Sequence, residues 1–191
     1  VWRDAQKTVN RAVARDFSMF RYLSVDENLL SRMIGDLLDP RGPHGQGVVF
    51  LERFVERIAP GDSDLARKMK AKLADAVVRC EAATSHIEAS KRRIDIRVDF
   101  PDDVGIGIEN KPWTIEQERQ LSDYVEELER RFSAGYVLVF LCREGREVTS
   151  LEASQREKLE GAGKLVVLGF TNGLVEWLRE CRASAEAERV R

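Results

Sequence analysis

The sequence predicts an α/β (α+β) domain in which a mixed central sheet is flanked by helices, with a helical segment at the N-terminal end. Three observations predict this class. Apolar residues recur at helical spacing through the first third of the chain. In the middle they alternate with charged residues at a period of two, which is typical of strands. The second half then alternates between helical and strand patterns, which places helices on the faces of a sheet.

Residues 1–75 are expected to be helical. Proline disfavours the helical conformation of the residue before it, so Asp39-Pro40 ends the first clear helix and Pro60-Gly61 ends the second. Ser63 or Asp64 is suited to cap the third. The expected helices are Leu23–Leu38, Val48–Ile58 and a segment from Ser63 or Asp64 to about Ala74.

Residues 76–182 are expected to form the sheet and its covering helices, within a single domain that spans 1–191. Arg93–Phe100 places Ile94, Ile96 and Val98 on one face, and its charged residues, Arg93, Asp95, Arg97 and Asp99, on the other. Pro101-Asp102-Asp103 is a turn signal, so this strand and Val104–Lys111 are expected to form a hairpin. The other expected elements are strands Ala76–Thr84, Tyr136–Leu141 and Leu165–Gly169, and helices Thr114–Phe132, Leu151–Glu160 and Asn172–Cys181.

Composition narrows the class of protein. The chain has 191 residues, of which 43% are hydrophobic and 34% charged, as in a soluble globular domain. No apolar run is long enough to span a membrane. Three scattered cysteines and two histidines disfavour zinc and iron–sulfur sites and suit a reducing, cytoplasmic setting. The net charge is −2, so nucleic-acid binding would require a local patch, for which the sequence offers Lys91, Arg92, Arg93 and Arg97.

The strand Val104–Lys111 carries the residues best suited to chemistry. Alternation places Glu109 and Lys111 on one face, beside two glycines that leave room for something to approach the sheet. Pairing with the preceding strand brings Asp95 within reach of Glu109. Two neighbouring carboxylates repel each other, and a hard divalent cation such as Mg²⁺ or Mn²⁺ relieves that repulsion. The alternative is a surface ion pair between Glu109 and Lys111, which this motif alone leaves open.

Two helices add polar residues that face the same region. On a helical wheel Trp113, Gln117, Gln120 and Tyr124 form a stripe beside an apolar face, and such groups suit phosphate or base contacts. Alternatively, the aromatic rings pack on the sheet and the glutamines are solvated. Glu27 lies on the apolar stripe of the first helix, where a carboxylate is costly unless a cation or donor meets it. The alternative for Glu27 is a favourable contact with the helix dipole at the surface.

Together these residues resemble the PD-(D/E)xK nuclease superfamily. The resemblance is carried by Arg-Arg-Ile-Asp95-Ile, by Ile-Glu109-Asn110-Lys111, and by Gln120-Leu-Ser-Asp-Tyr124, which is similar to the Gln-x-x-x-Tyr element of the exonuclease-like branch. The stretch from Glu27 through Asp39-Pro40 to His44-Gly45-Gln46-Gly47 is similar to a bacterial subfamily with an Ile-Glu-Asn-Lys…Gln-x-x-Gln-Leu-x-x-Tyr pattern. The literal Pro-Asp is absent, because Ile94 precedes Asp95. Subfamily members usually continue past this length, so the full protein is expected to be longer.

The resemblance implies a restriction-endonuclease-like fold and a role for each matching residue. Asp95 and Glu109 would bind Mg²⁺ or Mn²⁺ with the Asn110 carbonyl, and Glu27 would complete the metal shell. Lys111 would stabilise the developing negative charge. Arg93 would contact nucleic acid, and Gln117, Gln120 and Tyr124 would hold the strand or position Lys111, with Gln120 counted among the catalytic residues. His44 is expected to be structural.

The function expected from these residues is a magnesium-dependent deoxyribonuclease that binds DNA, without a membrane. The sequence does not decide between DNA and RNA as substrate or between endonuclease and exonuclease activity. A homo-oligomer is a further possibility that it leaves undecided. The main alternative is an inactive nuclease fold that serves as a DNA-binding or assembly module. A structural protein with salt-bridged strands is a further alternative. A P-loop kinase is disfavoured, because Gly161-Ala-Gly163-Lys164 lacks the following Ser or Thr.

Overall fold

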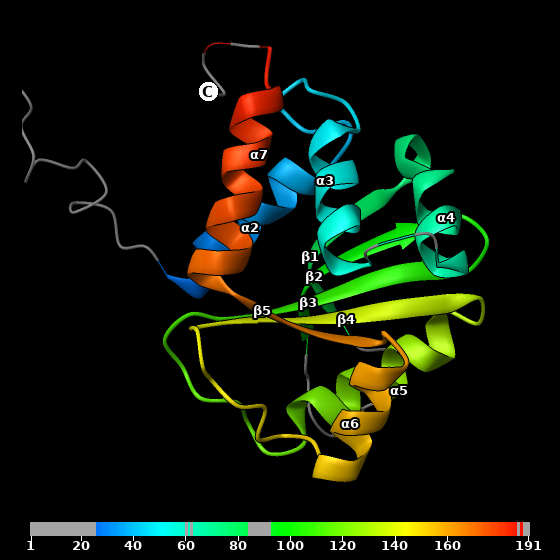
Figure 1. Cartoon of the computed structure of the whole chain (residues 1–191), viewed down its shortest axis with the longest axis vertical. Helices are drawn as coiled ribbons and strands as arrows, with labels where there is room; N and C mark the ends of the chain where they lie inside the picture. The colour runs from blue at the N-terminus through cyan, green and yellow to red at the C-terminus, as the bar shows by residue number, and fades with distance from the viewer. Residues whose placement is uncertain (1–25, 60, 62, 84–92, 187, 189–191) are drawn as a thin grey trace, which may run out of the picture.

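Five strands form one mixed sheet in the computed structural model, which describes residues 26–59, 61, 63–83, 93–186 and 188. The strands lie in the order β1-β2-β3-β4-β5 (Figure 1). The pairs β1–β2 and β2–β3 are antiparallel, whereas the pairs β3–β4 and β4–β5 are parallel. The bounds are β1 Val77–Ala83, β2 Arg93–Phe100, β3 Val104–Lys111, β4 Gly135–Cys142 and β5 Leu165–Gly169. The mixed sheet confirms the predicted fold class.

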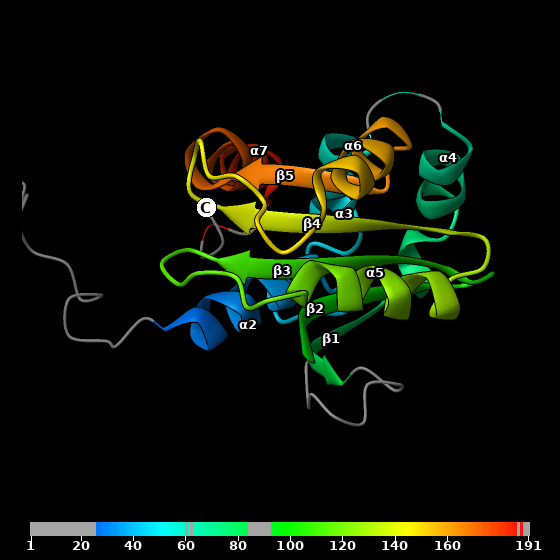
Figure 2. The same ribbon diagram turned by 90° about the horizontal axis from the view of Figure 1, so that it is seen from below.

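Helices cover both faces of the sheet and so create two apolar layers (Figures 1 and 2). One face is covered by α2 Glu27–Leu38, α3 Val49–Ile58, α4 Asp64–Lys70 and α7 Glu176–Ser184. The other face is covered by α5 Gln120–Arg131 and α6 Ala153–Gly161. A 3₁₀ turn (Leu73–Asp75) precedes β1, and a π-helical turn (Phe170–Val175) precedes α7.

The two glycines of β3 allow α5 to pack directly on the sheet. A Cβ atom on Gly105 would lie 2.2 Å from the Phe132 ring, and one on Gly107 would lie 2.9 Å from Leu128. The space beside the strand is therefore filled by the protein's own helix. The expectation that these glycines leave room for an incoming molecule is wrong, because α5 occupies that face as far as Gly107.

The hairpin of β2 and β3 forms as predicted, and its pairing ends where the charged residues begin. The ladder runs from Phe100–Val104 to Ile96–Ile108, after which no partners are paired between the two strands. On the other side of β2, Glu81 of β1 has a left-handed φ of 52°. The predicted alternation fails here, because Ile94 packs in the α5 layer whereas Ile96 packs in the opposite layer. The strands thus separate at the level of Asp95.

Several helices are shorter than the sequence predicts. The predicted helix Thr114–Phe132 begins only at Gln120, because Arg119 has a left-handed φ of 57° and Thr114 bonds to another part of the fold. The predicted helix Asn172–Cys181 starts as the π-helical turn. The first helix begins at Glu27, capped by Asp26, whose Oδ1 accepts a hydrogen bond from the Leu29 amide (2.7 Å). Residues 23–25 and Thr84 lie outside the described residues.

Candidate active site

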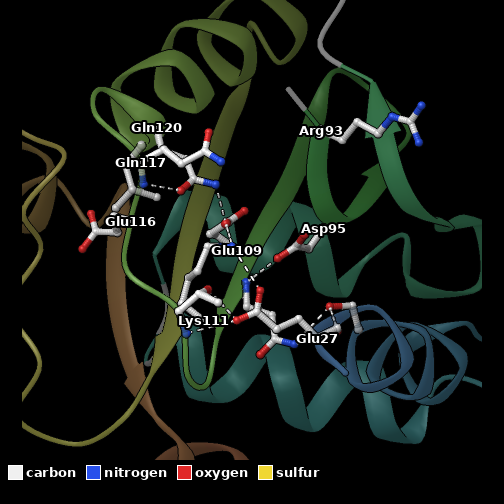
Figure 3. Close-up of polar contacts among 12 residues, drawn as sticks. Glu27, Arg93, Asp95, Glu109, Lys111, Glu116, Gln117 and Gln120 are labelled. Atoms are coloured by element: carbon white, nitrogen blue, oxygen red, sulfur yellow. Dashed lines mark hydrogen bonds and ion pairs between the residues drawn. The ribbon is translucent and has the colours of Figure 1, made fainter. Parts of the chain in front are cut away.

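Polar side chains from α2, β2, β3 and α5 meet where β2 and β3 separate (Figure 3). Asp95 comes from β2, and Glu109 and Lys111 come from β3. Glu27 reaches the same place from the first turn of α2, and Gln120 from the first turn of α5. Residues that are 93 positions apart in the sequence therefore form one cluster. We call it the catalytic cluster after the role that the sequence predicts for its members, Glu27, Asp95, Glu109, Lys111 and Gln120.

Glu109 lies at the centre of this cluster and is completely buried. Its Oε1 atom accepts hydrogen bonds from Lys111 Nζ (2.8 Å) and Gln120 Nε2 (2.6 Å). Its Oε2 atom is buried and has no hydrogen-bond partner among the described residues. Burial and the nearby Asp95 carboxylate raise the pKa of Glu109 to about 8, and Lys111 opposes the change. A buried carboxylate oxygen without a donor is costly, so Oε2 is suited to a cation.

The Asp95 side chain connects β2 to β3 beyond the point where backbone pairing between the two strands ends. Its Oδ2 atom accepts a hydrogen bond from the Asn110 backbone amide at 2.8 Å. This bond fixes the carboxylate of β2 against the backbone of β3, beside Glu109. Burial raises the pKa of Asp95, although the Asn110 amide and the Lys111 ammonium both favour its ionised form.

Lys111 lies between two carboxylates. Its Nζ atom is 2.8 Å from Glu109 Oε1 and 3.5 Å from Glu27 Oε2. Burial lowers the pKa of Lys111, but the combined attraction of Glu109, Asp95 and Glu27 outweighs burial, and the pKa is raised overall. Glu27 is held in turn by Thr114, whose hydroxyl (2.5 Å) and amide (3.3 Å) both donate to Glu27 Oε1. The lysine ammonium is therefore fixed in position and remains charged.

Asn110 joins β3 to α2 on the opposite face of the strand from Glu109. Its buried Nδ2 group donates to Ser31 Oγ (3.0 Å) and to the Glu27 backbone carbonyl (3.4 Å). Ser31 Oγ also donates to that carbonyl at 2.8 Å. The amide therefore sets the position of the helix turn that carries Glu27, while its own Oδ1 atom is buried and has no partner among the described residues.

Gln120 and Tyr124 lie inside the protein, with exposed fractions of 5% and 2%. Besides its bond to Glu109, Gln120 accepts through Oε1 from the Gln117 backbone amide (3.0 Å). The Tyr124 hydroxyl donates to the Arg93 carbonyl (2.7 Å) and lies 3.2 Å from Gln120 Nε2. These contacts place both side chains behind Glu109, where they orient it. Of the two predicted roles, positioning therefore fits the geometry better than contact with a strand.

The other predicted nucleic-acid contacts are not gathered in the cluster. The Gln117 side chain is exposed. The Arg93 guanidinium is exposed, points away from the cluster in Figure 3 and lies 3.3 Å from Glu81. Arg97, expected in a basic surface patch, is instead buried and paired with Asp99 at 2.7 Å. The prediction that Arg97 belongs to a basic surface patch is therefore wrong. Its guanidinium lies in the interior, where Asp99 balances its charge. Lys91 and Arg92 lie outside the described residues.

His44 belongs to the turn between α2 and α3. Its Nε2 atom lies 2.9 Å from the Asp39 carbonyl, and its Nδ1 atom accepts from the Gln46 amide (3.0 Å). Its ring stacks on Phe50 with centroids 4.8 Å apart. These contacts place the imidazole within the turn.

The sequence did not predict a role at the site for three residues that support the cluster or its neighbouring loops: Ser31, Thr114 and Glu116. Ser31 lies one helical turn after Glu27, so its spacing was a usable signal. Thr114 was predicted only as the first residue of a helix. Glu116 is buried, and its carboxylate accepts from Ser150 Oγ (2.6 Å) and from the backbone amides of Thr149 (3.1 Å) and Ser150 (3.0 Å). This contact across 34 residues has no local signature.

The cluster offers a restricted set of hard ligands for a metal. Within the residues that the structure describes, no three His, Cys, Asp or Glu side chains converge as a metal-binding group. Asp95 and Glu109 are the two neighbouring carboxylates of the cluster, and the unpartnered Glu109 Oε2 is a ligand atom that no described residue uses. A site with one or two carboxylates and otherwise backbone or water oxygens is typical of Mg²⁺.

Comparisons with known proteins agree with this geometry. A family model described as the PD-(D/E)XK nuclease superfamily matches residues 17–190, which is most of the chain. No curated protein and no solved structure matches it. Among the described residues, none of the helices combines the length and apolarity required to cross a bilayer.

Proposed function

Because the chain belongs to the PD-(D/E)XK nuclease superfamily, we propose that it is a metal-dependent nuclease that hydrolyses phosphodiester bonds of DNA. The observation that supports this most directly is the buried Oε2 atom of Glu109, which lies beside Asp95 and has no hydrogen-bond partner among the described residues. The other oxygen of the same carboxylate, Oε1, already contacts Lys111 Nζ at 2.8 Å. A cation would satisfy that oxygen and relieve the repulsion between the two carboxylates.

Each residue of the catalytic cluster then has a role that follows from its contacts. Asp95 and Glu109 would hold Mg²⁺ or Mn²⁺, with the Asn110 carbonyl as a further ligand and Glu27 acting through water. When bound, the metal would lower the pKa of a coordinated water and neutralise charge on the scissile phosphate. The charged Lys111 ammonium would stabilise the negative charge that develops on the phosphate oxygens, as a fixed donor already oriented by Glu109 and Glu27.

Gln120 and Tyr124 would act as positioning residues. Gln120 holds the Glu109 atom that also contacts Lys111, so it limits the rotation of the carboxylate. Tyr124 fixes the start of β2 through the Arg93 carbonyl, two residues before Asp95. Both contacts are buried, where hydrogen bonds restrict side chains most effectively.

Nicking of supercoiled plasmid DNA tests this proposal. We expect cleavage with Mg²⁺ or Mn²⁺ and none with EDTA. Lys111→Ala and Asp95→Ala should each lose about 100- to 1000-fold in rate, the magnitude typical of removing a preorganised group. Lys158→Ala and Asp75→Ala are matched controls, because both side chains are exposed and form no ion pair among the described residues. Cleavage that survives either cluster variant would contradict the proposal, whereas DNA binding without cleavage would support an inactive nuclease fold.

A further inference from the structure

We infer that a groove next to the catalytic cluster binds single-stranded DNA by stacking an unpaired base on Trp113, with phosphate contacts from Arg143 and Arg146. This inference rests on the proposed function and deepens it by naming the substrate class. The groove lies between the loop that joins β3 to α5 and the loop that follows β4, and has a volume of about 490 Å³. It is lined by Trp113, Ile115, Arg143, Arg146 and Thr149, together with the acids Glu144 and Glu147.

Trp113 connects this groove to the catalytic cluster. Its side chain is 60% exposed, although it follows the buried end of β3 by only two residues. The same side chain lines a second hollow of about 340 Å³ together with Glu27 and Thr114. Glu27 in turn contacts Lys111. A DNA strand that crosses Trp113 would therefore lead from the groove, through this hollow, to the catalytic cluster. Ile115, 79% exposed, extends the apolar surface on the groove side.

The two arginines of the groove are placed to contact a phosphate backbone. Arg143 is exposed and forms no ion pair among the described residues. Arg146 donates a hydrogen bond to the Lys111 carbonyl (3.3 Å) and lies over the Phe140 ring. Its guanidinium is therefore held beside the end of β3. The Glu144 carboxylate accepts hydrogen bonds from the backbone amides of Thr171 and Asn172, so it is held by this turn and not by either arginine. The groove therefore holds two arginines and two exposed carboxylates, and the Glu144 carboxylate is already bound to the turn that precedes α7.

The walls of the groove are fixed to each other before any strand arrives. Glu116 belongs to the loop that carries Trp113, and it accepts hydrogen bonds from Thr149 and Ser150 in the facing loop. Such a preformed groove loses little conformational freedom on binding. The base on Trp113 must be unpaired, because both faces of a base inside a duplex are already stacked. These features favour a single strand over a duplex.

Binding to the uncut strand tests the inference separately from catalysis. The Lys111→Ala chain would be titrated into labelled oligo-dT, a hairpin duplex of equal length and oligo-rU, with anisotropy and tryptophan fluorescence as readouts. We expect oligo-dT to bind most tightly and to quench the fluorescence. Adding Trp113→Ala should weaken binding roughly 5- to 100-fold, the range of one base stack, whereas Trp113→Phe should restore most of it. Arg143→Ala should reduce the salt dependence by about one counterion.

Three results would overturn the inference: unchanged oligo-dT affinity in Trp113→Ala, tighter binding of the duplex or of oligo-rU, or quenching that persists in Trp113→Phe. Trp177 is buried, so it serves as an internal reference for folding in every variant. Failure of the plasmid assay would count against the proposed nuclease but would leave this binding result to stand. Active cleavage with Trp113-independent binding would count against the groove alone.

Discussion

Replacing Glu109 with glutamine should stabilise the metal-free protein at alkaline pH while it abolishes cleavage. The pKa of Glu109 is raised from 4.5 to about 8, so the folded protein keeps a proton that the unfolded chain releases in this window. The contribution of the protonated Glu109 to the free energy of unfolding is therefore fully present below pH 4.5, and it is lost as the pH rises towards 8. The difference corresponds to roughly 5 kcal/mol at full ionisation.

The gain expected in Glu109→Gln is smaller than that total. The amide keeps an oxygen that can accept from Lys111 and Gln120, but its nitrogen takes the place of the buried Oε2 atom, where no described residue accepts its hydrogens, which costs about 1–3 kcal/mol. We therefore expect the variant to exceed the parent by about 2–3 kcal/mol at pH 8. At pH 5, where Glu109 is protonated in the folded parent, that cost should leave the variant no more stable than the parent.

Urea unfolding in EDTA from pH 5 to 9 measures this difference, with the buried Trp177 as the fluorescent reporter. Glu157→Gln is the matched control, since Glu157 is exposed on α6, and it should stay within about 0.5 kcal/mol of the parent at every pH. A Glu109→Gln protein that loses stability with pH as steeply as the parent would refute the reasoning. So would a variant less stable than the parent at pH 8.

Other perturbations should act through separate parts of the fold. Gly105→Ala should destabilise the protein by about 2–3 kcal/mol in urea unfolding, because the added Cβ atom would collide with Phe132. Adding Phe132→Leu should recover part of that loss. Equal stability of the single and double variants would contradict this. Thr114→Val should slow plasmid cleavage roughly 10-fold by releasing Glu27, with stability changed by less than about 1 kcal/mol, and an unchanged rate would argue against it. Mg²⁺ should raise the melting temperature more at pH 8 than at pH 6, because binding requires Glu109 to lose its proton; the reverse order would be inconsistent with a metal on that carboxylate.

The strands were predictable because each carries its own pattern. Arg93–Phe100 and Val104–Lys111 alternate clearly and are joined by a strong turn, so their bounds match the sequence-based prediction. The start of α5 was not predictable, because its helical periodicity extends back to Trp113. That stretch is instead drawn into long-range bonds between Thr114 and Glu27 and between Glu116 and Ser150. Tertiary contacts here override local propensity.

The catalytic cluster was partly visible in the sequence. The positions of Asp95, Glu109 and Lys111 on paired strands predicted that they meet, since strand register determines which side chains are neighbours. Their surroundings were not visible. The burial of Gln120 and Tyr124 depends on how closely α5 approaches Gly105 and Gly107, which is a property of packing and not of periodicity.

Anomalous diffraction from a crystal soaked in Mn²⁺ tests most directly whether Asp95 and Glu109 form a divalent-metal site. We predict a peak between the two carboxylates, in contact with Glu109 Oε2, with the Lys111 ammonium retained beside Oε1. The same soak of Glu109→Gln should show no peak. A manganese ion bound elsewhere, or a parent crystal in which Glu109 Oε2 has no metal at saturating Mn²⁺, would contradict the account.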